Sequence, residues 1–383
     1  MYSVDASKKT EKLKKAYVVN ADKKTEKLKK CYVVDDDKKL VKLWSAFTPR
    51  FIGANHNQIF KSVDGVAWEA VDVPWDASYK AYYNTAELSI GMTYGLGKYW
   101  IANSKYLCSS DDGDTWTIEK IHDNVNTSTY HGYNKVFFVN GQICAYDSYS
   151  QTLHITSDGK TWSTRSFSGY PRYLKELLYG EVGGTAYYFW LFVVDSDTNN
   201  RKIYRSTSIT GELTAILGYD TSYSRVKELT MGICNGKLFA TDYDTSDSEY
   251  DLMYGGASGL GVVHHEHHTY PFVFGTTGKG TLMAFTFAYS IYSVEVSDDG
   301  GVDVQKSTDM GLTTNSIYYN LHPPYNPEGT VAFPLNKNGT NCAFYKRSGD
   351  SAFTIISGVG TVTNYKDPYV AVYGVDGGGF YTT

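Results

Sequence analysis

The stretch that decides the fold is Ser-Asp-Asp-Gly-Asp-Thr-Trp at residues 110–116, because near-copies of it return along the chain. One copy, Ser-Val-Asp-Gly-Val-Ala-Trp, occupies residues 62–68, and another, Thr-Ser-Asp-Gly-Lys-Thr-Trp, occupies residues 156–162. The three tryptophans are 48 and 46 residues apart. Such a spacing is typical of propellers and solenoids, in which every period supplies one structural unit. The pattern therefore predicts an all-β chain built from repeated units.

The residue types in this motif suit a tight turn. Ser, Thr and Asp oxygens accept backbone N–H hydrogen bonds, and glycine adopts a positive φ without strain. We expect the tryptophan to pack between neighbouring units, so the motif has a structural role at the outer rim and no catalytic one. The residues given this role are Ser62, Asp64, Gly65, Trp68, Ser110, Asp112, Gly113, Trp116, Thr156, Asp158, Gly159 and Trp162.

The motif resembles the Asp-box, or BNR repeat, of sialidases and many other β-propeller proteins. Weaker copies follow at residues 208–214, around Gly259, at 297–303 and before Phe353. The tryptophan-equivalent positions are then 68, 116, 162, 214, 262, 303 and 353, a mean interval of 47.5 residues. This count predicts a seven-bladed β-propeller.

Within one period the pattern reads as two inner strands, a loop, a third strand, the motif as a turn and a fourth strand, which is one blade. Asn140-Gly141 and Asn235-Gly236 stand where two-residue hairpin turns belong. The first unit lacks an innermost strand, and residues 369–373 and 379–383 have strand character without a motif of their own. We therefore expect a C-terminal strand to close the ring and remove its exposed edges.

Residues 1–47 carry a different repeat, with a period of 15 residues. Tyr2, Tyr17, Tyr32 and Phe47 share one position of it, and valine and Lys-Lys pairs recur at the same spacing. The Tyr-Val-Val runs favour strands, although Leu13 and Tyr17 at i, i+4 also fit a helix, and a disordered lysine-rich leader is a third interpretation. We favour short strands and hairpins with turns at residues 20–23 and 35–38. Such units bury little alone and need a partner or another copy of the chain.

This 15-residue unit resembles the Lys- and Tyr-rich N-terminal repeats of structural proteins from phages that infect Firmicutes. The doubled lysine, the Tyr-Val-Val-Asp run and the period carry the resemblance over residues 2–47, while the family's turn glycine is replaced by Ala, Ser or Asp. The resemblance implies a virion protein, assembled in the bacterial host cytoplasm. Residues 1–47 would form an arm that anchors it to other virion proteins.

Charge and composition exclude several classes of function. The arm carries 13 lysines against 7 acidic residues, whereas the rest of the chain has 23 basic and 34 acidic residues. The acidic body argues against nucleic-acid binding. The sequence has no run of 18 apolar residues for a membrane span and no signal peptide at its start. Its five cysteines are odd in number and scattered, so we expect reduced thiols.

An enzyme on this scaffold is the second hypothesis. A sialidase needs three clustered arginines, a tyrosine nucleophile with a glutamate, and an acid, and other glycoside hydrolases need only two carboxylates. The run from His264 to His268 lacks the HExxH spacing of a zinc site and fits an exposed loop better, and the glycine-rich residues 255–261 lack the strand-then-helix context of a nucleotide site. We assign no catalytic, metal or cofactor residue. The arginines available in the body are Arg50, Arg165, Arg172, Arg201, Arg205, Arg225 and Arg347.

Tyrosine-rich stretches occur in the expected loops. Tyrosine provides rigid amphipathic contact area that stacks on sugar faces, although these rings could equally pack inside the blades. The candidate glycan contacts are Tyr82, Tyr83, Tyr130, Tyr133, Tyr318 and Tyr319.

These observations combine into one hypothesis. Residues 1–47 form an arm that binds other virion proteins and offers a surface for homo-oligomerisation, and residues 48–383 form the propeller. The protein is then a head- or tail-attached fibre or decoration, displayed for attachment to host-surface glycans.

Overall fold

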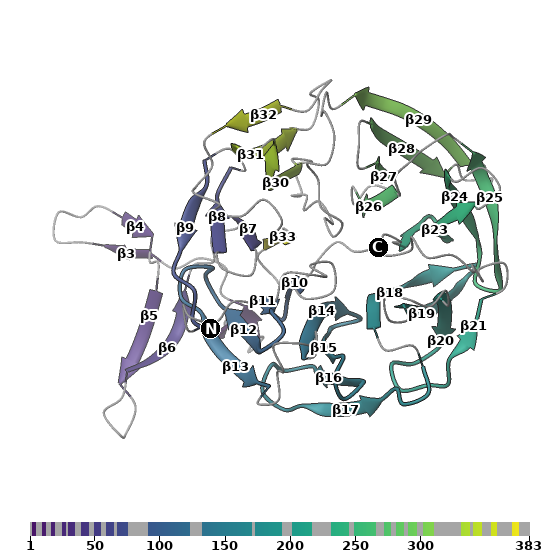
Figure 1. The fold of residues 1–383 in the computed structure, drawn as a ribbon. Helices are drawn as coiled ribbons and strands as arrows, with labels where there is room; N and C mark the ends of the chain where they lie inside the picture. The colour runs from purple at the N-terminus through teal and green to yellow at the C-terminus, as the bar shows by residue number, and fades with distance from the viewer. Residues whose placement is uncertain are drawn as a thin grey trace. The chain divides into compact units, whose positions relative to one another are not determined.

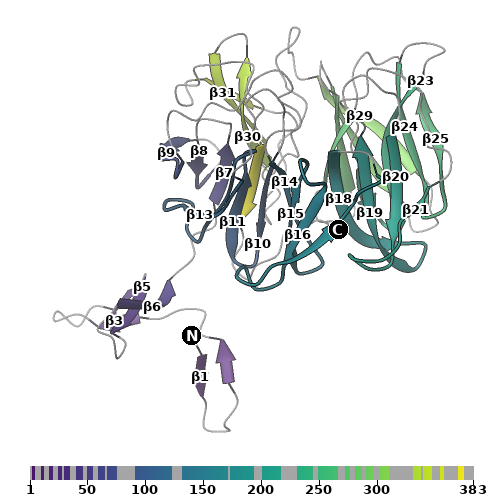
Figure 2. The same ribbon diagram turned by 60° about the horizontal axis from the view of Figure 1, so that its bottom comes forward.

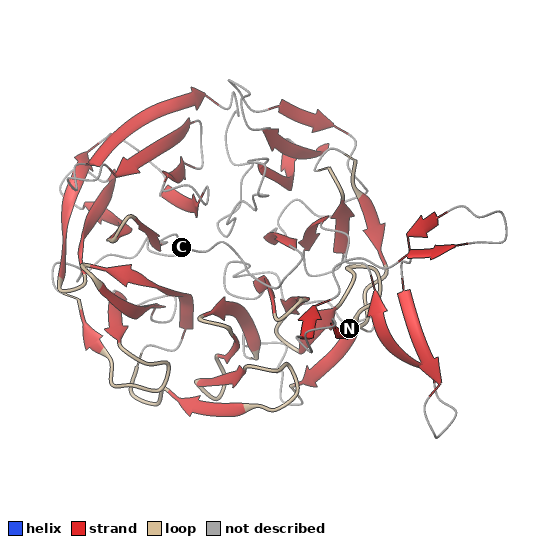
Figure 3. Ribbon diagram, turned by 180° about the vertical axis from the view of Figure 1, so that it is seen from behind, coloured by secondary structure: helices blue, strands red, loops and turns tan. Residues whose placement is uncertain are grey.

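The computed structural model is an all-β chain: every regular element in the part it describes is a β-strand (Figure 3). The chain divides into two compact units, Met1–Thr48 and Pro49–Thr383. The described residues are 2–4, 10–12, 17–19, 25–27, 30–34, 40–45, 50–54, 59–64, 67–75, 91–122, 132–170, 173–193, 201–216, 231–244, 249–265, 272–276, 281–286, 290–296, 302–309, 331–337, 340–346, 354–357 and 370–374.

The first unit contains three separate two-stranded antiparallel sheets. The pairs are β1 (Tyr2–Val4) with β2 (Thr10–Lys12), β3 (Tyr17–Val19) with β4 (Thr25–Lys27), and β5 (Lys30–Val34) with β6 (Leu40–Ser45).

Each 15-residue repeat of the first unit forms one hairpin, and all three hairpins share a register. Tyr2 pairs with Lys12 and Tyr17 with Lys27, fifteen residues on. The third hairpin keeps the tyrosine–lysine pair but adds an irregularity next to Tyr32. The first strand of each hairpin therefore carries the β-favouring tyrosine and valine positions of the repeat, whereas the second strand of the first two hairpins is Thr-Glu-Lys.

The second unit contains seven antiparallel sheets in its described residues, here numbered sheet 1 to sheet 7 and given from the innermost strand outward. Sheet 1 contains β33 (Val370–Gly374), β7 (Arg50–Ala54), β8 (Ile59–Ser62) and β9 (Glu69–Val71), and sheet 2 contains β10 (Gly91–Gly95), β11 (Lys98–Ala102), β12 (Tyr106–Ser110) and β13 (Thr117–Ile121). Sheet 3 contains β14 (Tyr133–Val139), β15 (Gln142–Asp147), β16 (Thr152–Thr156) and β17 (Ser163–Ser166), and sheet 4 contains β18 (Tyr173–Val182), β19 (Thr185–Val193), β20 (Arg201–Ser206) and β21 (Thr214–Ala215). Sheet 5 contains β22 (Met231–Cys234), β23 (Lys237–Asp244), β24 (Glu249–Gly256) and β25 (Gly259–His265). Sheet 6 contains β26 (Phe272–Thr276), β27 (Thr281–Thr286), β28 (Ser290–Val296) and β29 (Val302–Asp309), and sheet 7 contains β30 (Val331–Lys337), β31 (Thr340–Lys346) and β32 (Thr354–Ser357).

These sheets stand around a common axis with their first strands toward the centre (Figures 1 and 2). Innermost strands of successive sheets contact each other: β33 contacts β10, and the series continues through β14, β18, β22 and β26. A ring of antiparallel sheets joined through their inner strands is the architecture of a β-propeller.

The strand nearest the C-terminus completes sheet 1. β33 pairs antiparallel with β7, with Val372 opposite Ile52 and Tyr373 opposite Phe51. This is the strand expected from residues 369–373, whereas residues 379–383 lie outside the described part. The edge of β7 is thereby hydrogen-bonded, so the two ends of the second unit are held in one sheet.

In sheets 3 and 5, a two-residue turn joins the first strand to the second, as the Asn-Gly pairs predict. Asn140 and Gly141 have φ values of 47° and 74°, and Asn235 and Gly236 have 43° and 72°. Positive φ at both central residues defines the type I′ turn, whose twist matches that of the strands it joins. The hairpin prediction is confirmed at both positions.

The hydrophobic core lies in the seams between sheets. The seam between sheets 3 and 4 packs Tyr146 and Phe167 against Trp190 and Phe192, all 0% exposed. On the second strand of sheet 2, Trp100 is likewise fully buried and belongs to the seam with sheet 3. Because sheets 3 and 4 each bury side chains against both of their neighbours, this part of the ring is stabilised seam by seam.

Candidate functional site

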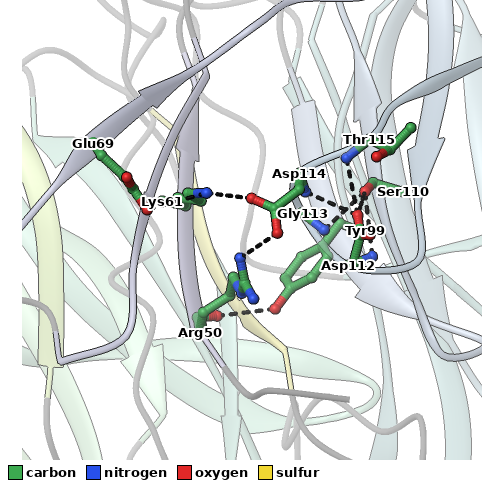
Figure 4. A network of polar contacts seen from close by, with 9 residues as sticks. All are labelled: Arg50, Lys61, Glu69, Tyr99, Ser110, Asp112, Gly113, Asp114 and Thr115. Atoms are coloured by element: carbon green, nitrogen blue, oxygen red, sulfur yellow. Dashed lines mark hydrogen bonds and ion pairs between the residues drawn. The ribbon is translucent and has the colours of Figure 1, made fainter. Parts of the chain in front are cut away.

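The repeated motif forms a turn between the third and fourth strands of sheets 1 to 3, and residues 62–68, 110–116 and 156–162 are called the first, second and third box turns below. In the second, the Ser110 hydroxyl accepts the N–H of Gly113 at 2.8 Å. Asp112 Oδ1 accepts the N–H groups of Asp114 and Thr115, both at 2.9 Å. Gly113 has a φ of 74°, where a side chain would be strained. Figure 4 shows these contacts.

The third box turn repeats this arrangement atom for atom. Thr156 Oγ1 accepts the N–H of Gly159 at 2.9 Å, and Asp158 Oδ1 accepts those of Lys160 and Thr161 at 2.8 and 2.7 Å. The hydrogen bonds from Thr161 and Lys160 favour the ionised carboxylate, so the pKa of Asp158 lies far below its ordinary value.

In the first box turn, Asp64 Oδ1 accepts the N–H of Ala67 at 3.0 Å and the Ser62 hydroxyl at 3.1 Å. Gly65 lies outside the described residues. The aspartate thus bonds a later backbone N–H in all three turns.

The fourth copy is shifted from the position that its sequence suggests. In the three box turns, seven residues separate the last paired residues of the flanking strands, as between Ser109 and Thr117. In sheet 4, Arg205 pairs with Thr214, which leaves eight residues. The turn is therefore residues 206–213 and not 208–214: Ser206 takes the serine position, and Leu213, 8% exposed, replaces the tryptophan.

The box turns bind the preceding sheet. Asp114 of the second box turn accepts a hydrogen bond from Arg50 Nη1 at 2.9 Å and one from Lys61, both on sheet 1 (Figure 4). Its bond with Asp114 raises the pKa of Lys61 above the ordinary value. A Cβ placed on Gly113 would lie 2.6 Å from Ile52 Cδ1, so this glycine allows the turn to sit directly on β7.

In the next two seams, between sheets 2 and 3 and between sheets 3 and 4, the turn also contacts the preceding sheet, but through an aromatic contact in the first and hydrogen bonds in the second. In the third box turn, Trp162 packs edge-on against Trp100 of sheet 2 at 6.0 Å, and Lys120 Nζ lies 4.9 Å from the Trp162 ring centre. In the turn of sheet 4, the carbonyl oxygens of Ile209 and Gly211 accept hydrogen bonds from Arg165 of sheet 3, both at 2.5 Å. The turns thus join one sheet to the sheet before it.

The prediction that the motif tryptophans pack between neighbouring sheets is confirmed for Trp162. Trp162 lies between two sheets, as predicted. Trp68 contacts Phe51 of its own sheet, among other neighbours, with ring centres 6.4 Å apart, and Trp116 is 9% exposed with its Nε1 donor unbonded. The contacts of the motif tryptophan therefore differ from one box turn to the next.

Of the three arginines with described side chains, two form contacts across seams and one contacts a residue of its own sheet. Arg50 pairs with Asp114, and Arg165, which bonds sheet 4, also lies 4.4 Å from the Phe167 ring centre. Arg205 lies 5.1 Å from the Tyr187 ring centre. These three arginines sit in different sheets, so no three-arginine cluster forms among them. Of the others, Arg201 is described by its backbone alone, and Arg172, Arg225 and Arg347 lie outside the described residues.

The histidine run is placed differently from the expected loop. His264 and His265 are the last residues of β25, and residues 255–261 span a hairpin with Gly256 paired to Gly259. Both are strand-paired because the apolar run before them continues β25. Residues 266–268 lie outside the described part. Among the residues that the structure describes, no group of three or more His, Cys, Asp or Glu side chains could hold a metal ion.

Tyr133 is the one candidate glycan contact in the described residues, and the structure corrects its assignment. It is 6% exposed, and its ring contacts His122 at 6.0 Å and His154 at 5.4 Å. It starts β14, where the seam with sheet 2 covers it, so the ring cannot stack on a ligand. The other five, Tyr82, Tyr83, Tyr130, Tyr318 and Tyr319, lie outside the described residues.

The comparison with known proteins leaves the family open. No protein-family profile matches the chain, and no curated protein matches it by sequence. Among solved structures the chain is similar to virginiamycin B lyase from Staphylococcus aureus (11% identity, TM-score 0.48, covering 72% of this chain and 86% of that chain). It is also similar to the Cps50 (Swd1) β-propeller domain of Myceliophteria thermophila (8% identity, TM-score 0.48, 71% and 87%). Values this low carry no argument, so the fold rests on the sheets themselves.

One polar cluster at the seam of sheets 2 and 3 escaped the sequence analysis. His122, just after β13, lies 3.2 Å from Asp147 at the end of β15, measured from Nε2 to Oδ2. Their side chains are 11% and 6% exposed. No motif joins these residues, which come from different sheets, so only the neighbouring tyrosines could have drawn attention to them.

No helix in the described part of the chain is long and apolar enough to cross a membrane.

Proposed function

We propose that this chain is a phage virion structural protein, a head- or tail-attached fibre or decoration. Residues 1–47 anchor it to other virion proteins, and a seven-bladed propeller spanning residues 48–383 is displayed to bind host-surface glycans. Its location is the virion, which is assembled in the bacterial host cytoplasm. The observation that carries this proposal is the N-terminal repeat, in which every 15-residue unit supplies one hairpin of the same register.

The arm's own structure supports an anchoring role. A two-stranded hairpin buries too little apolar surface to be stable alone in water. Its outer strand edges present backbone N–H and C=O groups that another chain can pair with. Three such hairpins in a row, rich in lysine, therefore suit a segment that orders against a partner or against the arms of other copies.

The repeat count and the sheets both support the proposal of seven blades. The seven copies of the motif, with the fourth shifted to residues 206–213, fall in or next to the last strands of seven different sheets. In the described seams, the contacts are those of core packing and of box turns, which hold the sheets together. Binding of a glycan is therefore expected at the exposed turns and loops.

The test is a pair of proteins, the full chain and residues 49–383, each added to particles that lack the protein. We expect the full chain to sediment with the particles and the truncated chain to stay in the supernatant. The truncated chain should keep the far-UV circular dichroism of the propeller, because it is a compact unit by itself. Sedimentation of the truncated chain would contradict the anchoring role.

The alternative is a sialidase-like or other glycoside hydrolase on the same scaffold. We rank it second because Arg50 and Arg165 are engaged in separate seams and Arg205 contacts Tyr187 within sheet 4. Incubating the protein with sialylated and neutral glycans and analysing the products by mass spectrometry separates the two functions. Release of free sugar would favour the hydrolase, and binding without release favours the adhesin.

A further inference from the structure

The seam between sheets 2 and 3 carries four rings in successive contact, of which the first, Tyr149, is exposed and the third, Tyr133, is buried. Tyr149 is 48% exposed and contacts His122 at 5.5 Å with an interplanar angle of 77°. His122 contacts Tyr133 in turn, and Tyr133 contacts His154. The outermost ring is thus supported on its inner side by the half-buried ring of His122 and, behind it, the buried ring of Tyr133.

Asp147 fixes the turn that holds Tyr149. Its Oδ1 accepts the N–H of Tyr149 at 2.9 Å, and its Oδ2 accepts the Ser150 hydroxyl at 2.6 Å. The same carboxylate faces His122 across the seam. One buried acid therefore sets both the backbone of the turn and the imidazole under the ring.

A tyrosine ring held in this way is suited to binding. Immobilising a side chain on binding costs conformational entropy, and a ring already fixed avoids much of this cost. Tyr149 is one of only three large hydrophobic side chains exposed among the described residues, with Val63 and Ile121. Ile121 directly precedes His122 in the chain, so two of the three belong to this seam.

Polar groups beside the ring indicate what it would bind. Ser150 is exposed, and its hydroxyl donates to Asp147, which leaves its oxygen able to accept a hydrogen bond. The Thr152 hydroxyl donates to the Ser150 carbonyl at 3.2 Å and has the same capacity. A flat apolar ring face next to hydroxyl acceptors matches a sugar, which has C–H groups on one face and hydroxyls at its edge.

We propose that the surface formed by Tyr149, Ser150 and Thr152 is a glycan-binding subsite, with Asp147 and His122 as positioning residues. The ring of Tyr149 stacks on the apolar face of one pyranose, and the two hydroxyls accept hydrogen bonds from its edge. This inference rests on the proposed function, which it deepens by placing glycan attachment at one seam of the ring.

The experiment applies the full-length protein and three variants to a printed array of bacterial-surface and animal glycans. Tyr149→Ala removes the ring, Tyr149→Phe keeps it, and Val63→Ala removes another exposed hydrophobic side chain (65% against 48% for Tyr149) in the first box turn of sheet 1. We expect Tyr149→Ala to weaken binding about tenfold, equivalent to about 1.4 kcal/mol. Tyr149→Phe and Val63→Ala should bind like the parent protein.

The outcomes separate the subsite from the function. If the parent protein binds glycans and Tyr149→Ala binds them equally well, the subsite is wrong and glycan attachment stands. If the parent protein binds no glycan on the array, both attachment and the subsite are overturned. Equal thermal unfolding of the four proteins excludes misfolding as the cause, which we expect because both substituted positions are exposed.

Discussion

Asp114 reaches from the second box turn into the neighbouring sheet and accepts a hydrogen bond from Arg50 at 2.9 Å. Arg50 opens β7, the strand to which the C-terminal β33 is paired. The carboxylate also bonds Lys61 on β8. Asp114 thus joins sheet 2 to sheet 1, which contains both β7 and β33, the first and last described strands of the second unit.

Replacing Asp114 should loosen this seam. The Arg50 side chain is 14% exposed, so Asp114→Ala removes a carboxylate from a largely buried cation, and we expect a loss of about 1–2 kcal/mol in the free energy of unfolding. The control is Asp111→Ala in the same turn, whose 3.7 Å contact with Lys98 is exposed and should contribute less than about 0.5 kcal/mol. Urea unfolding measures both. Equal losses would mean that the Asp114 bridge is no more than a surface ion pair.

Substituting Gly113 and Gly97 separates the cost of a steric clash with a neighbouring sheet from the cost of backbone strain. Both have positive φ, 74° and 76°, but a Cβ on Gly113 would meet Ile52 at 2.6 Å, whereas one on Gly97 meets nothing within 4 Å. Gly97→Ala should cost about 1 kcal/mol from strain alone. Gly113→Ala should cost about 2–4 kcal/mol because overpacking adds to it. Thermal unfolding of the two variants decides whether the box turn is pressed against β7.

The Asp158 carboxylate should make stability depend on pH. Its pKa is lower in the folded chain than in the unfolded chain, where it is about 3.9. The stabilisation is therefore present above the unfolded pKa and is lost as the pH falls toward the folded pKa. Asp158→Asn keeps an acceptor oxygen but cannot titrate, so its unfolding midpoint should fall less steeply than that of the parent protein below about pH 5. Parallel curves for the two proteins would show that Asp158 contributes nothing to acid sensitivity.

Trp162 should stabilise the seam between sheets 2 and 3 through its ring. Trp162→Ala removes its contacts with Trp100 and Lys120, and we expect a loss of about 2–4 kcal/mol in unfolding free energy. Trp162→Phe retains an aromatic edge against Trp100 and should lose less than half of that amount. Chemical unfolding followed by circular dichroism avoids the change in fluorescence that either variant causes. A larger loss for phenylalanine than for alanine would contradict a packing role.

The buried cysteines should resist modification. Cys108, Cys144 and Cys234 are free and buried, and burial raises the pKa of the Cys108 thiol to about 12. Since the thiolate is the reactive form, native protein at pH 8 should leave these three thiols unlabelled by iodoacetamide. Peptide mapping before and after denaturation identifies each thiol. Rapid native labelling of Cys108 or Cys144 would mean that their seams open readily.

Some features follow from short-range sequence alone. Asn140-Gly141 and Asn235-Gly236 predict their hairpins because positive φ is a property of the residues in the turn. The box turns are equally local, since Ser110 and Asp112 bond N–H groups no more than three residues away. The period of these turns, read along the chain, also predicts repeated β units.

Other features arise only when distant strands meet. Nothing near Arg50 in the sequence indicates Asp114, and the shifted turn at residues 206–213 becomes visible only from the pairing of Arg205 with Thr214. Tyr133 reads as an exposed loop tyrosine, but the seam buries it, whereas Tyr149 is left at the surface. The sequence by itself determined the turns and the repeating unit, because hydrogen bonds within a few residues specify them. The tertiary structure alone decided which side chains are covered and which face solvent, because that depends on the neighbouring sheet.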